Sequence, residues 1–396
     1  MQSVSIIGGG AASFITADLL SQKFHVTIYE KGKSIGRKFL VAGKGGFNLA
    51  HNLSKTKLTS KYTPNDFLNA AILNFGVDEL RQWYAELGVP TFVGTSNRVF
   101  PEKGISPADV LHKIKAKLQN QNVQIQLEHE FIGFTENKKP LVKSKKGTQE
   151  IMTDIVIFSL GGGSWKVTGA NSDWLAHFQK MDISTTPFQS SNCGLNINWS
   201  DSIKDFHLGK PLKNIAVKHH DFQIKGEALL TAYGIEGNAI YPISSQVRNS
   251  IINDLNTDIF IDFKPNQSEN ELLRKIKNSK PSNYGKALKL DSVAVALIKS
   301  KLDKEEFLDP NTFIHTLKNT PIQVESLRPV EEAISTVGGI STTELNSDFS
   351  LKKLPNTFCI GEMVDWDAPT GGFLLQGCFA MGVHSANSIL GHKIAD

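Results

Sequence analysis

The sequence predicts an α/β fold in which both ends of the chain build one domain and a long insert interrupts it. First, an apolar strand at Val4–Ile7 is followed by three glycines, a helix-forming stretch and a second strand. Second, the alternation of strand and helix returns after residue 336. Third, residues 190–262 carry short alternating segments, which are typical of a β-rich unit. Strands that alternate with helices favour a parallel sheet with right-handed crossovers. We therefore expect four stretches: 1–189, the first part of the split domain; 190–265, a β-rich insert; 266–335, the helical part of the insert; and 336–396, the C-terminal part of the split domain.

Each element follows from a local pattern. Residues 11–22 space their apolar side chains at helical intervals, and His25–Glu30 is a run of β-forming residues. Ser106 is a candidate helix cap, and Pro107 suits the first helical position because the N–H that it lacks would be unpaired there. The apolar run 155–160 ends at three glycines and is expected to be the return strand of the split domain. The other expected elements are two helices within 64–88, strands at 123–127, 130–134, 215–219, 222–224, 240–243 and 259–263, helices within 268–318, a strand at 357–361 and a closing helix at 373–390.

The charge balance argues against nucleic acid as a partner. Lys and Arg number 43 against 39 Asp and Glu, so the formal net charge is +4 and is spread along the chain. One dense lysine run, 138–146, surrounds Pro140 and Gly147 and is expected to be a solvated hairpin tip. We therefore expect a small-molecule substrate and no nucleic acid, and the sequence leaves the oligomeric state open.

Cysteine usage and hydropathy indicate the compartment. The cysteines, Cys193, Cys359 and Cys378, are odd in number and lack CxxC spacing, which favours a reducing compartment and predicts no metal site. No apolar run reaches the roughly 18 residues that cross a bilayer. The first apolar segment begins three residues in, without a basic region or cleavage site. A cytoplasmic protein without a membrane partner is expected.

The first motif with a chemical meaning is the glycine turn after the first strand. Gly8 permits the tight turn, and Gly10 allows the main chain to approach a pyrophosphate at the start of the helix. Glu30 follows Gly10 by twenty residues, at the end of the second strand, where it can accept hydrogen bonds from a ribose diol. Ser13 stands where the fingerprint has its third glycine. The pattern predicts dinucleotide binding.

Two further segments favour FAD over NAD as the dinucleotide. The loop 36–48 carries three cations and four glycines shortly after Glu30, so it can wrap an extended cofactor. Near the C-terminus, a strand leads to Gly361-Glu362, and residues 368–372 precede the closing helix. A helix N-terminus directed at a flavin ring stabilises the negative charge that develops when the ring is reduced.

These segments resemble a bacterial flavoprotein family. GGGAAS, GRKFLVAGKGGFN, FVGTSNRVFP, SLGGGSW and TFCIGEMVDWDAPTGGFLLQGCFAMG are similar to the NAD(P)/FAD-dependent oxidoreductases that include the aminoacetone oxidase family and a dehydro-bile-acid reductase. That family belongs to the glutathione-reductase-like superfamily. The resemblance covers the whole chain, insert included. It implies a Rossmann-like FAD-binding domain from both chain ends, with an inserted β-barrel-like and helical region.

The resemblance and its motifs imply a set of residues for FAD. Phe131 is expected to contact FAD through its backbone, because it follows the strand expected beside the adenine. Glu362 stands where many relatives have Asp. The full set is Gly8, Gly10, Ala11, Ala12, Ser13, Glu30, Lys31, Arg37, Lys38, Gly43, Gly45, Gly46, Asn48, Phe131, Gly161, Gly361, Glu362, Gly371, Gly372 and Phe373.

Catalytic groups do not follow from spacing. No second nucleotide fingerprint occurs between 150 and 335, which leaves NAD(P)H open as a transient electron donor without a domain of its own. Several residues keep both a functional and a structural interpretation: His51 as proton donor, Arg98, Arg328 and Glu362 as anion anchors, Trp366 as a cover for the ring, Asp365 and Asp367 as acid–base groups, and His219 with His220 as a metal pair.

The predicted function is an FAD-dependent oxidoreductase that transfers a hydride or electrons through a non-covalent flavin to an unidentified small molecule. Three alternatives stay open at this point. They are an RNA-modifying flavoenzyme, a flavin-holding regulatory protein without turnover, and a NAD-dependent dehydrogenase without flavin.

Overall fold

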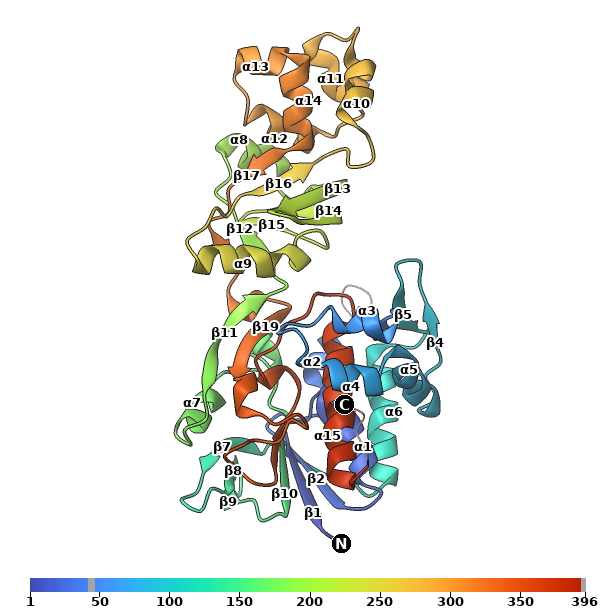
Figure 1. The fold of residues 1–396 in the computed structure, drawn as a ribbon, viewed down its shortest axis with the longest axis vertical. Helices are drawn as coiled ribbons and strands as arrows, with labels where there is room; N and C mark the ends of the chain where they lie inside the picture. The colour runs from blue at the N-terminus through green and yellow to red at the C-terminus, as the bar shows by residue number, and fades with distance from the viewer. Residues whose placement is uncertain (42–46, 393–396) are drawn as a thin grey trace. The chain divides into compact units, whose positions relative to one another are not determined.

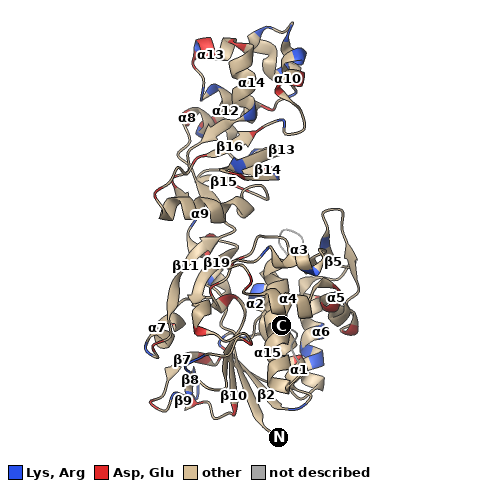
Figure 2. Cartoon of the chain, viewed as in Figure 1, with Lys and Arg blue, Asp and Glu red and all other residues tan. Residues whose placement is uncertain are grey.

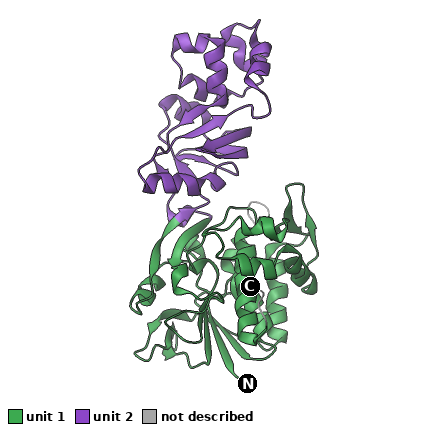
Figure 3. Cartoon of the chain, viewed as in Figure 1, with its two compact units in different colours: residues 1–189, 335–396 green, residues 190–334 purple. Residues whose placement is uncertain are grey.

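The computed structural model describes residues 1–41 and 47–392, and it divides the chain into two compact units. Unit 1 combines residues 1–189 with 335–396, and unit 2 comprises residues 190–334 (Figure 3). Each unit has a hydrophobic core of its own. Because the second core begins at Leu195 and ends at Val324, the insert buries its apolar residues among themselves.

Unit 1 is built on a five-stranded sheet in the order β20-β10-β1-β2-β6. Figure 1 labels three of these strands, β10, β1 and β2. All neighbours are parallel, and Val4 of β1 lies opposite Ile155 of β10 and Val26 of β2. The predicted parallel sheet from both chain ends is confirmed, since β20 comes from the C-terminal part. The five strands are β1 (Ser3–Ile7), β2 (His25–Glu30), β6 (Gln124–Leu127), β10 (Ile155–Phe158) and β20 (Thr357–Cys359).

The helix after the glycine turn, α1 (Ala11–Leu20), packs against the closing helix α15 (Phe373–Leu390) and against α6 (Pro107–Asn120). Gly382 lets α1 and α15 approach closely, because a Cβ there would lie 2.7 Å from the Ala12 carbonyl oxygen. Ser106 caps α6 as predicted, since its side chain accepts a hydrogen bond from the Asp109 N–H. The other helices of unit 1 are α2 (Arg37–Val41), α3 (Lys55–Thr59), α4 (Asn69–Asn74), α5 (Val77–Glu86) and α7 (Trp174–Gln179).

Smaller sheets complete unit 1. An aromatic cluster of Phe131, Phe134, Phe158 and Phe178 joins the antiparallel sheet β7-β8-β9 to strand β10 and helix α7. The remaining strands of unit 1 are β7 (Glu130–Phe134), β8 (Pro140–Ser144), β9 (Gly147–Glu150), the trio β3 (Ala50–His51), β5 (Arg98–Pro101) and β4 (Thr91–Val93), and the pair β11 (Thr185–Ser191) and β19 (Ser335–Ile340).

Unit 2 contains the inserted antiparallel sheet, in the order β17-β16-β13-β14-β15-β12-β18. Helices interrupt its strands along the chain, and the last two strands follow the final helix of the unit. Its strands are β12 (Leu195–Asn196), β13 (Pro211–His219), β14 (Phe222–Thr231), β15 (Gly234–Glu236), β16 (Ile259–Asp262), β17 (Thr320–Ile322) and β18 (Ser326–Leu327). Its helices are α8 (Asp201–His207), α9 (Ser244–Ile252), α10 (Glu269–Ile276), α11 (Tyr284–Ala287), α12 (Ser292–Lys299), α13 (Lys304–Leu308) and α14 (Pro310–Lys318).

Three local predictions are corrected by the structure. Residues 240–243 are not a strand but lead through a 3₁₀ turn, Tyr241–Ile243, into α9, because Pro242 has no N–H for a sheet and its fixed φ suits a helical start. The lysine run 138–146 is not one hairpin tip, since β8 separates the turn at Lys138 from the tip at 145–146. His220 lies in the turn after β13 and not within the strand, so strand alternation does not separate it from His219; their ring centroids are 4.3 Å apart and both rings contact Ser250.

Candidate functional site

The glycine turn at the end of β1 has no room for a side chain. Gly8 has φ +107°, and a Cβ there would lie 2.2 Å from the carbonyl oxygen of Ser159, which follows β10. The Gly8 N–H donates to the Tyr29 carbonyl at 2.8 Å, which fixes the turn against β2. The backbone therefore turns within a space that only glycine can occupy.

Gly10, at the start of α1, is the opposite case. It is the N-cap residue in an extended conformation, no side chain caps the helix, and a Cβ there would meet no described atom within 4 Å. Ser13, at the third position of the fingerprint, is buried, and its hydroxyl donates to the Gly10 carbonyl at 2.7 Å. The hydroxyl therefore has a hydrogen-bond partner at the start of the same helix. The first N–H groups of α1 are left without intrahelical acceptors, as at any helix start. Open space beside uncapped N–H groups suits an anionic phosphate.

Glu30, at the end of β2, holds two turns in place. Its Oε2 accepts the Gly9 N–H at 2.8 Å, and its Oε1 accepts the Gly32 N–H at 2.6 Å. The next residue, Lys31, donates to Asn171 at 2.9 Å, and burial lowers the pKa of its ammonium, while Glu130, Glu30 and Asp173 oppose that shift. The acid therefore lies beside the glycine turn, where it contacts the Gly9 N–H.

The C-terminal motif comes to the same end of the sheet. Lys38 of α2 forms an ion pair with Glu362 at 2.8 Å, and a Cβ on Gly361 would lie 3.2 Å from the Ala12 side chain. Gly161 has φ +75° and, like Gly10, would place a Cβ in a position without a described neighbour within 4 Å. Arg37 donates a hydrogen bond of 3.3 Å to the Val167 carbonyl. These groups surround the carboxyl ends of the parallel strands, where open α/β sheets bind their ligands.

A second group of residues gathers at the N-terminus of α15. Gly371 and Gly372 have φ of +114° and +97°, and a Cβ on Gly372 would lie 2.6 Å from the Ala50 backbone of β3. A Cβ on Gly371 would lie 3.5 Å from His51 Nδ1 and 3.6 Å from Arg98 Nε. The His51 ring stacks on Phe373, with 4.8 Å between their centroids. The two glycines thus let the helix start against β3 and β5.

Several polar groups at this helix start are without a partner in the described part of the chain. His51 Nδ1 is buried and has no hydrogen bond of good geometry there, although the Gly371 backbone lies beside the ring. Asn48 Nδ2, in the segment before β3, is also buried without a hydrogen bond in the described residues. Arg98 is partly buried and makes no ion pair with any carboxylate in residues 1–41 and 47–392. No side chain caps α15. Buried polar groups normally find partners, so this end of the site is suited to a polar ligand.

The environment of His51 predicts a neutral imidazole at pH 7. Burial lowers the pKa of the ring, the nearby Gly371 backbone opposes that shift, and the positive charges of Arg98 and Lys61 lower the pKa further. We expect the His51 resonances to titrate with a midpoint below the unperturbed 6.5 in a histidine NMR pH series. The assignment would come from the spectrum of H51N. A midpoint at or above 6.5 would show that a nearby anion, and not the two cations, controls the ring.

The structure does not bring every predicted residue to this site. The ring of Phe131 packs in the aromatic cluster of β7, so its backbone contact with FAD stays a prediction. Trp366 is 2% exposed, and its indole N–H donates to the Gly361 carbonyl at 2.9 Å. Its ring therefore packs in the core and supports the Gly361-Glu362 segment. Asp365 accepts from Thr186 and from the Gly338 N–H, and thereby joins loops. Gly43, Gly45 and Gly46 lie outside the described residues.

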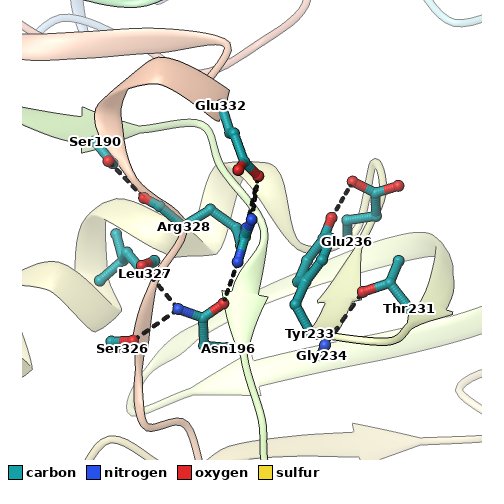
Figure 4. Close-up of polar contacts among 10 residues, drawn as sticks. All are labelled: Ser190, Asn196, Thr231, Tyr233, Gly234, Glu236, Ser326, Leu327, Arg328 and Glu332. Carbon is teal, nitrogen blue, oxygen red and sulfur yellow. Dashed lines mark hydrogen bonds and ion pairs between the residues drawn. The ribbon is translucent and has the colours of Figure 1, made fainter.

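Arg328 is engaged within unit 2 (Figure 4). Its Nε donates to Glu332 at 2.8 Å, its Nη1 donates to Asn196 at 3.1 Å, and its guanidinium lies 4.1 Å from the centroid of the Tyr233 ring. The Tyr233 hydroxyl donates to Glu236 at 2.6 Å; burial and that carboxylate raise the pKa of the tyrosine. Because its nitrogens and its flat face already have partners, Arg328 ties β12, β15 and β18 together and is not an anion anchor.

Sequence reasoning did not connect His51 with Arg98. The two residues are directly opposite in the antiparallel pair β3–β5, and β3 is only two residues long. A strand of that length leaves no periodic signal. The FVGTSNRVFP segment indicated a role for Arg98 through its resemblance to the family, and in the structure this segment is a hairpin that includes Arg98.

No helix within residues 1–41 and 47–392 is long and apolar enough to span a membrane. In the same residues, no group of three or more His, Cys, Asp or Glu side chains is arranged to hold a metal ion.

Comparisons with known proteins agree with the fold. The chain is 24% identical to the 3-dehydro-bile acid delta(4,6)-reductase of Clostridium scindens, over 96% of this chain and 97% of that protein. It is 23% identical to the ribosomal RNA dihydrouridine synthase of Haemophilus influenzae, over 97% of each. The crystal structure of 3-ketosteroid delta1-dehydrogenase from Sterolibacterium denitrificans matches 99% of this chain and 100% of its own, with a TM-score of 0.55 and 13% identity. The family model described as the HI0933-like protein Rossmann domain matches residues 2–388. The chain therefore belongs to the HI0933-like family of FAD-dependent Rossmann-fold oxidoreductases.

Proposed function

We propose that this protein is an FAD-dependent reductase of carbon–carbon double bonds that are conjugated to a carbonyl group. The names of the two kinds of relatives describe such reductions: one concerns a delta(4,6) bond of a 3-dehydro bile acid, and the other makes dihydrouridine. In uracil, too, the bond that is saturated is conjugated with a ring carbonyl. The shared feature of the two substrates is therefore an electron-poor double bond and not a common shape.

FAD would be held by the residues at the carboxyl ends of the sheet. Gly10 and the N-terminus of α1 suit the pyrophosphate, and Glu30 suits a ribose diol, because each of its oxygens has a lone pair beyond the backbone hydrogen bond that it accepts. Lys38 and Glu362 suit the polar part nearer the flavin. When bound, FAD supplies the capacity to take up and deliver a hydride.

The chain's own contribution to the chemistry is positive charge at the start of α15. Adding a hydride to a conjugated double bond moves negative charge onto the carbonyl oxygen. Arg98, together with the uncapped N-terminus of α15, provides a fixed positive potential that is suited to an anion. The observation that carries the proposal is this partly buried guanidinium beside a helix start, which forms no ion pair within residues 1–41 and 47–392.

The proposal predicts selective reoxidation of the reduced flavin. The purified protein should show flavin absorbance, and after anaerobic reduction by dithionite the absorbance should return on addition of 2-cyclohexenone. Cyclohexene and cyclohexanone, which lack either the carbonyl or the double bond, should leave the flavin reduced. Stopped-flow absorbance near 450 nm is the measurement, and separate trials with NADH and NADPH identify the physiological class of donor.

The contribution of Arg98 is tested in the same assay. R98Q should retain FAD and lower the rate of enone-dependent reoxidation by about two orders of magnitude, the usual effect of removing one group that stabilises developing charge. R81Q is a matched control, because Arg81 donates to Thr91 of β4, in the same small sheet as Arg98, and does not line the start of α15. The proposed chemistry would be rejected if 2-cyclohexenone, cyclohexene and cyclohexanone reoxidised the flavin at equal rates. It would also be rejected if none of the three compounds reoxidised the flavin.

A further inference from the structure

Besides the lysine run 138–146 in unit 1, a second short segment rich in positive charge lies in unit 2. Residues 274–290, here called the basic segment, contain six cations and no Asp or Glu: Arg274, Lys275, Lys277, Lys280, Lys286 and Lys289. Because the whole chain has a net charge of +4, the residues outside this segment have a net charge of −2. The small net charge of the whole chain therefore gives no sign of this strongly basic segment.

The fold turns all six cations toward solvent. Ile276, Tyr284 and Leu288 of the basic segment are buried in the core of unit 2, and every cation lies at an exposed position between or beside them. Figure 2 shows the basic residues in blue at and beside α10. A capping box at Ser268 and Glu271 fixes the start of α10, so its acidic end and its basic end are separated along the helix. Burial of the apolar positions therefore determines which face carries the charge.

The cations are not held in ion pairs, although the carboxylate of Glu271 in the first turn of α10 acts on Lys275 and Arg274 at longer range. In the described part of the chain, none of the six forms an ion pair with a carboxylate; Lys275 donates instead to the neutral Gln267 at 2.6 Å. Lys264 lies among them and donates to the Lys289 carbonyl at 3.1 Å. Burial lowers the pKa of Lys264, and the charges of Lys275 and Lys289 lower it further against the opposing effect of Asp291. Positive charges thus lie close together around Lys264 and repel one another. A bound polyanion would offset this repulsion.

We propose that the basic segment docks the phosphate backbone of RNA. The inference rests on the proposed function, since uracil in RNA is one substrate class with the required conjugated double bond and two relatives are named for ribosomal RNA. Exposed cations spaced along a surface, with the exposed Asn278, Ser282 and Asn283 among them, are the groups that contact phosphates and sugars. A membrane surface fits less well, because no large apolar side chain of the basic segment is exposed.

The test compares two variants of the FAD-loaded protein that each lose five charges. R274Q, K277Q, K280Q, K286Q and K289Q are combined in the first, which keeps Lys275 because it bonds Gln267. K138Q, K139Q, K143Q, K145Q and K146Q are combined in the second, which removes the other lysine run, in unit 1. Binding of fluorescently labelled transcripts of ribosomal RNA is measured by anisotropy between 50 and 200 mM KCl.

We expect the first variant to bind RNA at least tenfold more weakly at 100 mM KCl and the second to stay within about twofold of the unaltered protein. The slope of log affinity against log salt should fall by about 3.5 to 4.5 in the first variant, since five contacts are lost and each lost phosphate contact removes roughly 0.7 to 0.9. Equal loss in both variants, or no loss in either, would overturn the proposal. So would a first variant that loses binding to phosphatidylglycerol vesicles or to polyglutamate but keeps its RNA affinity.

The failure of this inference is distinguishable from that of the proposed function. Both variants should keep full flavin content and unchanged reoxidation by 2-cyclohexenone, because all ten positions lie outside the predicted FAD residues. Loss of RNA binding with intact enone reduction supports the docking surface. RNA binding that is independent of the basic segment, together with intact enone reduction, overturns the docking surface alone.

Discussion

Replacement of Gly10 by alanine should leave the protein folded and remove its flavin. The Gly10 backbone is extended, at φ −98° and ψ −171°, which any residue adopts, and the added Cβ would meet no described atom within 4 Å. That open space lies where the pyrophosphate would approach the start of α1. We expect a melting temperature, measured on cofactor-stripped protein, within about 2 °C of the unaltered chain, and a flavin-to-protein ratio near zero after gel filtration.

Gly8→Ala is the informative comparison, two residues away. The Cβ would lie 2.2 Å from the Ser159 carbonyl oxygen, and φ is +107°, so the substitution strains the backbone and separates β1 from the segment after β10. We expect G8A to accumulate as insoluble protein, whereas G10A stays soluble and colourless. A G10A protein that retains one flavin per chain would contradict the placement of the pyrophosphate.

This pair of glycines shows what the sequence could predict about the fold. A strand, a glycine turn, a helix and an acid twenty residues on are local features, and they identified Gly8, Gly10 and Glu30 as neighbours. The closing helix was also predicted with its observed limits, 373–390. The approach of α1 to α15 was not predicted, because it depends on Gly382 facing Ala12 and Thr16 across the core. A helical glycine has the same local pattern whether or not another helix lies against it.

The polar end of the site was predicted less completely. His51, Arg98 and Gly371 are far apart in sequence and meet because β3 pairs with β5 and α15 starts against β3. Each had a separate functional interpretation, yet nothing in the sequence gave their distance. Glu30 was predicted for ribose, but its two backbone hydrogen bonds show that it also maintains the turn. The basic segment is visible in the sequence, but the net charge of the whole chain does not reveal it, because acidic residues elsewhere offset its six cations.

Replacement of Asp18 by alanine should give the largest loss of stability that does not touch the candidate site. Asp18 is 3% exposed and accepts hydrogen bonds from Trp83 Nε1 at 2.6 Å and from Gln121 Nε2 at 2.7 Å, and it pairs with Lys117 at 2.9 Å. Removing one partner of a buried charged network costs about 3–5 kcal/mol. For unit 1 this corresponds to a melting temperature about 10 °C lower, measured by circular dichroism.

The reason for this large effect is the position of Asp18 on α1. A carboxylate near the C-terminal end of a helix is unfavourable for the helix itself, so its stabilising effect must come from the groups it joins. Those groups belong to α5 and α6 and to the residue after α6, and all of them lose their common acceptor in D18A. D18N keeps the shape and one acceptor oxygen, and should lose less than half as much as D18A. If D18N and D18A were equally destabilised, the negative charge itself would be the essential part; if neither changed, the network would not hold the helices of unit 1 together.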